Sequence, residues 1–214
     1  MDERPIGIFD SGVGGLTVFK EIRRLLPEED LIYFGDTARV PYGAKSLPVI
    51  RRFSLEITRF LESMKVKFIV VACNTASALT LDYLRRQTSI PIVGVIDPGV
   101  RGAISDSKAR KIGVIGTVAT IRSAAYQTRL KRFRENCVVF AKACPLLVPL
   151  VEENLVDSQI TKLALEMYLS EFRHLKLDSL ILACTHYPLL KNSIAEFLGP
   201  TVKLIDSATE TAKE

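Results

Sequence analysis

Short runs of β-branched and aliphatic residues alternate with longer amphipathic stretches along the whole chain. Short apolar runs bounded by polar residues are typical of buried strands, and apolar residues at every third or fourth position are typical of helices. Strands that alternate with helices form parallel sheets, because each helix carries the chain back across the sheet. The pattern therefore predicts an α/β fold with eight strands, at residues 5–10, 31–35, 67–72, 91–96, 111–116, 137–141, 178–183 and 202–206.

The eight predicted strands fall into two similar sets of four. Three pairs of segments match at a separation of roughly 110 residues, which indicates an internal duplication: Ile6-Gly7-Ile8 with Ile112-Gly113-Val114, Ala72-Cys73 with Ala183-Cys184, and Ile96-Asp97 with Ile205-Asp206. We therefore expect two similar doubly wound parallel-sheet domains related by pseudo-twofold symmetry. The first domain is placed at 1–97, with 208–214 returning to it, and the second at 98–207.

Polar residues follow most of the predicted strands, and ligands of open parallel sheets bind beyond these carboxyl ends. The first half places there Asp10-Ser11, Asp36-Thr37, Cys73-Asn74-Thr75 and Asp97, and the second half Thr117, Cys144, Cys184-Thr185-His186 and Asp206. If the halves face each other, equivalent strand ends converge and Cys73 lies opposite Cys184. We expect the active site in this cleft between the domains.

Cys73 and Cys184 have the positions that a pair of proton-transferring bases requires. Each follows a strand and precedes a predicted helix, whose N-terminal N–H groups favour a thiolate. Taken alone, each also fits a small buried hydrophobe, which is the usual behaviour of free cysteine. Together, two thiols on opposite faces of one carbon atom can remove a proton from one face and return one to the other, which inverts a stereocentre.

Neighbouring residues can assist these thiols. Asp10 ends the first strand where it can support Cys73, and His186, with a reference pKa of about 6.5, can assist proton transfer near Cys184. The alternatives are a loop or helix cap for Asp10 and a bond to a backbone carbonyl for His186. Cys144 is a weaker candidate base, because its equivalent in the first half lies near Asp36 rather than near Cys73.

Composition narrows the function classes. The net charge of +5 is spread over short basic pairs that indicate solvated helix faces, with one denser cluster that includes Arg129, and no nucleic-acid motif is present. No apolar run approaches the roughly 20 residues that span a bilayer. The four cysteines have neither CxxC nor zinc-ligand spacing. We expect a cytoplasmic enzyme with reduced thiols, no metal, and no nucleic-acid or membrane partner.

Five segments in order along the chain resemble the glutamate racemases, of the aspartate/glutamate racemase superfamily. These are residues 8–17 (IFDSGVGGLT), Asp36-Thr37 with Pro41-Tyr42-Gly43, residues 72–77 (ACNTAS), residues 148–152 (VPLVE) and residues 184–188 (CTHYP). The glycine turn at 12–15 matches neither phosphate-loop pattern, so its N–H groups are better suited to a carboxylate than to a nucleotide. The DSGVGG and PYG motifs are similar to the glutamate branch more than to the aspartate branch.

The resemblance implies an enzyme that interconverts L- and D-glutamate for peptidoglycan synthesis, without pyridoxal phosphate or any other cofactor. By this likeness Cys73 handles the proton on the D-glutamate face and Cys184 the proton on the L-glutamate face. Asp10 supports Cys73, and His186 and Glu152 support Cys184. Implied substrate contacts are Asp10, Ser11, Tyr42, Gly43, Asn74, Thr75 and Thr185, to which Thr117 is added from its strand-end position. A homodimer is also implied.

The C-terminal segment leaves two alternatives open. Ser207-Ala208-Thr209-Glu210 has the spacing of a capping box and predicts a helix, after which the chain stops at Glu214. Members of the family usually continue with a longer helix that returns to the first domain. The alternatives are a related enzyme, such as an aspartate racemase or another cysteine-dependent isomerase or lyase, and a catalytically silent homologue with a binding role, which the short C-terminus favours.

Overall fold

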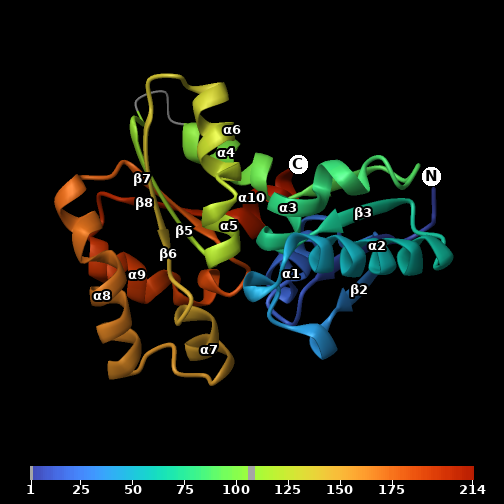
Figure 1. Cartoon of the computed structure of the whole chain (residues 1–214), viewed down its shortest axis with the longest axis horizontal. Coiled ribbons are helices and arrows are strands. Elements are labelled where there is room, and N and C mark those ends of the chain that lie inside the picture. The colour runs from blue at the N-terminus through green and yellow to red at the C-terminus, as the bar shows by residue number, and fades with distance from the viewer. Residues whose placement is uncertain (1, 106–108) are drawn as a thin grey trace.

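Two four-stranded parallel sheets form the framework of the computed structural model, which describes residues 2–105 and 109–214 (Figure 1). The first sheet contains β1 (Ile6–Asp10), β2 (Leu31–Gly35), β3 (Phe68–Val71) and β4 (Ile92–Gly94). The second contains β5 (Lys111–Gly116), β6 (Val138–Ala143), β7 (Ser179–Ala183) and β8 (Lys203–Asp206). The predicted fold class is therefore confirmed, and each predicted strand overlaps an observed one.

Both sheets have the same strand order, β2-β1-β3-β4 and β6-β5-β7-β8. In the first sheet Ile8 pairs with Tyr33 on one side and Val70 on the other, and in the second Val114 pairs with Ala141 and Ile181. The central strands are buried on both faces, which explains why they are apolar runs rather than alternating sequences. Equal strand order places β1 and β3 where β5 and β7 lie in the other half, as the matched segments predicted.

Helices cover both faces of the first sheet. On one face α2 (Leu47–Ser63) and α3 (Asn74–Leu84) bury a cluster that includes Phe9, Ile57 and Ile69. On the other face α1 (Leu16–Leu25) contributes Val18 and Ile22, which pack on Ile8 and Val70. Two short 3-10 turns, η1 (Thr37–Arg39) and η2 (Tyr42–Ala44), follow β2.

The second sheet is covered in the same way. One face packs on α7 (Leu147–Glu152), α8 (Gln159–Leu175) and α9 (Lys191–Leu198), which is preceded by a 3-10 turn, η3 (Tyr187–Leu190). The other face packs on α4 (Ile96–Ile104) and α6 (Ala125–Phe133), through residues that include Val100 and Tyr126. A short helix, α5 (Val118–Arg122), follows β5.

Two helices cross between the halves. Helix α4 directly follows the first sheet, yet its Val100 packs with Ile112 and Ile181 of the second. Helix α10 (Ser207–Lys213) follows the second sheet, yet its Ala208 lies in the apolar cluster of Val18 on α1. Figure 1 shows α10, coloured red, between the two sheets. The division into domains at 97 and 207, with 208–214 returning to the first domain, stays a prediction.

Among the residues that the structure describes, no helix is both long and apolar enough to cross a membrane.

Candidate active site

Cys73 lies at the carboxyl end of β3, where it caps the N-terminus of α3. Its thiol donates to the Ser11 Oγ at 3.5 Å and accepts a hydrogen bond from the backbone N–H of Ala76 at 3.4 Å. Ser11 follows β1, the strand adjacent to β3. The parallel pairing of β1 with β3 thus brings together two motifs that lie more than sixty residues apart in the chain.

Asp10 ends β1 and is fully buried. Its carboxylate accepts a hydrogen bond from the Gly12 N–H at 3.0 Å and one from the Thr185 hydroxyl at 3.4 Å. Thr185 belongs to the second domain, directly after Cys184. Asp10 therefore lies where the two halves meet, and not only at the edge of its own sheet.

Cys184 follows β7 and begins a chain of three polar groups. Its sulfur lies 3.8 Å from Nδ1 of His186, and Nε2 of the same ring lies 3.0 Å from the Glu152 carboxylate. Cys184 is buried, whereas the Glu152 side chain at the end of α7 is 43% exposed. The imidazole thus connects a buried thiol with a carboxylate that reaches solvent, which is the arrangement that a proton route requires.

The glycine turn after β1 approaches these residues closely. A Cβ atom on Gly14 would lie 2.5 Å from the Thr185 hydroxyl and 2.6 Å from the His186 ring, so only glycine fits there. Thr17 in the next turn donates its hydroxyl to the Thr185 carbonyl oxygen at 3.0 Å. The backbone of the first domain is therefore packed directly against Thr185 and His186 of the second.

Hydroxyl and amide groups complete the junction. The Thr75 hydroxyl lies 2.9 Å from that of Thr117 and 3.2 Å from that of Thr120, and Thr117 and Thr120 are 3.0 Å apart. The Asn74 Oδ1 accepts a hydrogen bond from the Tyr126 hydroxyl at 2.6 Å. The N-terminus of α3, which carries Cys73, is thereby tied to α5 and α6 of the second domain.

Burial dominates the electrostatics of both thiols. It raises the pKa of Cys73 to about 11, with the Asp10 carboxylate acting in the same direction and the Ala76 N–H opposing it. Burial also raises the pKa of Cys184, the backbone N–H of His186 opposes this, and a negative charge on Cys73 would raise it further. The N–H group at the helix N-terminus lowers the pKa of the Cys73 thiol, in the predicted direction, but the loss of hydration on burial outweighs it.

The segment that contains Tyr42 and Gly43 is fixed by hydrogen bonds to Asp36. Tyr42 is buried and donates its hydroxyl to the Asp36 carboxylate, which also accepts from Arg39 at 2.8 Å. The tyrosine hydroxyl is thus committed to Asp36. A Cβ atom on Gly43 would lie 2.9 Å from that of Thr117, so this segment presents backbone rather than side chains to the domain junction.

The other two cysteines lie outside this constellation. Cys144 is buried, its thiol donates to the Lys142 carbonyl oxygen at 3.7 Å, and burial raises its pKa to about 12. Cys137 is buried at the start of β6, in the apolar cluster under α6. Across residues 2–105 and 109–214, no group of three or more His, Cys, Asp or Glu residues is arranged to hold a metal ion.

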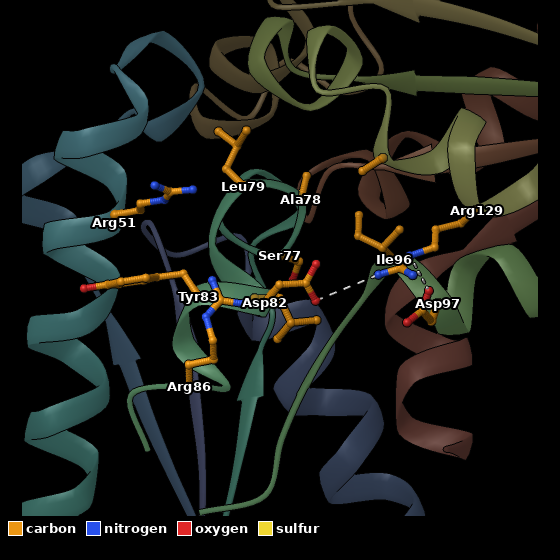
Figure 2. Close-up of a pocket in the computed structure, with 12 residues that line it drawn as sticks. Arg51, Ser77, Ala78, Leu79, Asp82, Tyr83, Arg86, Ile96, Asp97 and Arg129 are labelled. Carbon is orange, nitrogen blue, oxygen red and sulfur yellow. Dashed lines mark ion pairs between the residues drawn. The ribbon is translucent and has the colours of Figure 1, made fainter. Parts of the chain in front are cut away.

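The sequence did not indicate the contacts of Tyr126 and Arg129. Tyr126 gives no sequence signal, because an aromatic residue inside an amphipathic helix is typical of the core. Arg129, in the denser basic cluster, is partly exposed and also forms ion pairs, which its sequence did not indicate. Its guanidinium lies 3.2 Å from the Asp97 carboxylate and 4.0 Å from that of Asp82. Figure 2 shows this arginine between the two aspartates, in a pocket of about 160 Å³ that contains none of the predicted site residues.

Comparison with known proteins identifies the family. The model of the Asp/Glu/hydantoin racemase family matches residues 6–214. The glutamate racemase of Geobacter metallireducens is 55% identical over 213 residues, which cover 100% of this chain and 79% of that protein. The crystal structure of the glutamate racemase isoform RacE1 from Bacillus anthracis superposes with a TM-score of 0.96 at 46% identity, covering 100% of this chain and 80% of that one.

A third relative was solved with a ligand. The glutamate racemase from Francisella tularensis, in complex with D-glutamate, has a TM-score of 0.93 and 44% identity, again over 100% of this chain and 80% of that one. The resemblance predicted from the five motifs is confirmed. The chain belongs to the Asp/Glu/hydantoin racemase family and, within it, to the glutamate racemases.

Proposed function

We propose that this chain interconverts L- and D-glutamate by moving a proton at Cα between Cys184 and Cys73, without a cofactor, and so supplies D-glutamate for peptidoglycan. The observation that carries the proposal is the pair of buried thiols at equivalent strand ends, each with its own hydrogen-bonding partners. Inversion of a carbon centre by proton transfer requires one base on each of its two faces.

Each direction of the reaction conserves protons. With L-glutamate bound, the Cys184 thiolate takes the Cα proton and becomes a thiol, while the Cys73 thiol gives its proton to the opposite face and becomes a thiolate. With D-glutamate the two cysteines exchange roles. After each turnover the enzyme must redistribute one proton, and the His186–Glu152 pair offers a route for it, since the imidazole lies 3.8 Å from the Cys184 sulfur and Glu152 reaches solvent.

The surrounding polar groups are suited to an amino acid. Burial raises the pKa of the Asp10 carboxyl group, because a buried negative charge is unfavourable. The ammonium group of a bound amino acid would supply the positive charge that stabilises the ionised carboxylate. Hydroxyl and amide groups of Ser11, Asn74, Thr75 and Thr185, with backbone N–H groups at Tyr42 and Gly43, are donors suited to the substrate carboxylates. The relatives named above are glutamate racemases, which supports this activity over an aspartate racemase, another isomerase or lyase, or a silent homologue.

We also propose that the protein works in the cytoplasm as a homodimer, which rests on its family alone. Sedimentation velocity at micromolar concentration should give about twice the chain mass of 23.8 kDa. A sedimentation coefficient of a single chain across the concentration range would contradict the dimer.

Isotope exchange tests the reaction. L-glutamate incubated with the protein in D2O should lose optical rotation, and the D-glutamate formed should carry deuterium at Cα while early residual L-glutamate stays mostly protiated. Both follow because the proton that is returned comes from the second thiol, which has exchanged with solvent. Constant rotation with the full-length, folded protein would overturn the proposed function.

Cysteine replacements test the assignment of the two bases. Cys73→Ser and Cys184→Ser should each lower kcat by about 10²- to 10⁴-fold in both directions, which is the usual contribution of a positioned acid or base. Cys144→Ala is the matched control, because Cys144 is equally buried but lies outside the site, and it should keep wild-type activity. Full activity in either site variant would refute the two-base assignment.

A further inference from the structure

Asn74 is the first residue of α3 and directly follows Cys73. It is buried, with 2% of its surface exposed, and its amide has two chemically different ends. The oxygen end, Oδ1, accepts the hydrogen bond from Tyr126, whereas the nitrogen end, Nδ2, has no partner among the described residues. A buried N–H group without a partner costs free energy, so Nδ2 is a donor that lacks an acceptor from outside the chain.

The tyrosine determines which end of the amide is free. The Tyr126 oxygen lies 2.6 Å from the Asn74 side chain, which suits an O–H···O bond and is short for an N–H···O bond. Burial raises the pKa of Tyr126 well above its ordinary value, so the hydroxyl keeps its proton. A neutral hydroxyl that donates to the amide holds Oδ1 on the tyrosine side and leaves the NH2 group on the other.

Tyr126 is itself firmly held. Its side chain is fully buried in the apolar cluster that covers the second sheet, where it packs with Val100 and Ile112 among others. Helix α6, which carries it, begins directly after Ala124 in the left-handed conformation at φ 54°. The orientation of a first-domain amide is thus fixed by a side chain anchored in the second domain.

We propose that Tyr126 is a positioning residue, which orients the Asn74 amide so that its NH2 group donates to a carboxylate of the bound amino acid. This inference rests on the proposed function. A carboxylate is the acceptor that an uncharged NH2 group beside the reacting thiol would need, because the substrate ammonium cannot accept a hydrogen bond. The same contact ties the donor's orientation to the docking of the two domains.

Phenylalanine at this position removes the hydroxyl and keeps the ring. Tyr126→Phe should raise KM for both glutamate enantiomers, and the calorimetric Kd for D-glutamate, by about tenfold, which corresponds to one hydrogen bond to a charged group. The value of kcat should change much less, because neither Tyr126 nor Asn74 moves a proton. Asn74→Ala should raise KM by a similar factor.

The double variant separates positioning from a merely structural role. Because Tyr126 acts through Asn74, Tyr126→Phe should have almost no further effect on KM in the Asn74→Ala background. Arg129→Gln is the matched control. It removes different contacts of the same helix, the ion pairs with Asp97 and Asp82, and should leave KM and kcat at wild-type values.

Three outcomes would overturn the inference. They are an unchanged KM and Kd in Tyr126→Phe, additive effects in the double variant, and an equal rise of KM in Arg129→Gln. Each can occur while the wild-type chain still racemises glutamate, so each leaves the proposed function intact. A wild-type chain that neither turns over nor binds glutamate would overturn the proposed function, and the positioning role with it.

Discussion

At the level of single residues, Asp10 illustrates a conflict between function and stability. Its carboxylate is fully buried and is surrounded by hydrogen-bond donors rather than by a lysine or an arginine. Burial raises its pKa, so the ionised form that substrate binding needs is the form that the folded chain accommodates least well. Residues at binding sites are commonly retained at such a cost in stability.

Asp10→Asn should therefore abolish racemisation and stabilise the fold. A raised pKa means that Asp10 favours folding below its unfolded-state pKa of about 3.9, and that this contribution is lost as the pH rises through the folded-state pKa. The amide carries no charge at any pH. At pH 8 we expect Tm to rise by roughly 2–4 °C, the shift that a gain of about 1 kcal/mol in unfolding free energy produces in a chain of this size. Near pH 4 the gain should vanish.

Asp36→Asn is the matched control for that measurement. Asp36 is also buried, but Arg39 and Tyr42 donate to its carboxylate. The substitution removes the buried partner of the Arg39 guanidinium and leaves it the more exposed Glu56, so Tm should fall instead of rise. Stabilisation by both substitutions, or by neither, would contradict this electrostatic account.

The site was predictable from sequence where chemistry and position coincide. Cys73 and Cys184 have reactive side chains at equivalent strand ends, Asp10 and His186 lie at the same strand ends, and the resemblance of the surrounding motifs supplied Glu152. Tyr126 could not be predicted, because its contact with Asn74 joins two helices from different domains and depends on how those domains dock. The raised pKa of the thiols also escaped prediction, since burial is a property of the folded chain.

At the level of helices and strands, the chain crosses between its halves through two helices, α4 and α10. The apolar face of a helix indicates that it is buried, but not against which sheet. Helix α4 thus extends the core of the second sheet although it follows the first, and α10 does the opposite. The strands, by contrast, were predicted closely because runs of β-branched residues are self-evident in the sequence.

The packing of α10 on α1 can be tested with one substitution. Ala208 is buried in the cluster that contains Val18 and Ile22. Ala208→Glu places a charge among apolar side chains and should cost on the order of 3 kcal/mol of unfolding free energy, measured by urea denaturation. Lys213→Ala on the same helix removes only an exposed ion pair with Glu210 and should cost less than about 1 kcal/mol. Equal losses would show that α10 is not anchored through Ala208.

For the whole molecule, function depends on how closely the halves approach at the glycine turn. A methyl group on Gly14 would overlap the Thr185 hydroxyl and the His186 ring, so the domains can meet as they do only with glycine there. Gly14→Ala should lower kcat/KM by about 10²-fold, as expected when reacting groups are displaced by roughly 1 Å.

Gly199→Ala separates this effect from the general cost of replacing a glycine. A Cβ atom on Gly199 would have no other atom of the described residues within 4 Å apart from its chain neighbours, but the φ of +86° is unfavourable for alanine. That variant should lose stability by about 1 kcal/mol and keep its activity. Wild-type activity in Gly14→Ala would show that the close approach is not required.

The position of α10 also affects the order in which the protein can be assembled as it is made. Ile8 and Val18 emerge from the ribosome early, but Ala208, a member of the same cluster, is added roughly 190 residues after Val18. At ordinary translation rates the nascent first domain waits about 10–40 s with part of its apolar surface uncovered, while the second sheet is synthesised. Newly made chains should therefore depend on chaperones during this interval, and ribosome-bound chains halted before residue 207 should be digested by protease faster than chains that include α10.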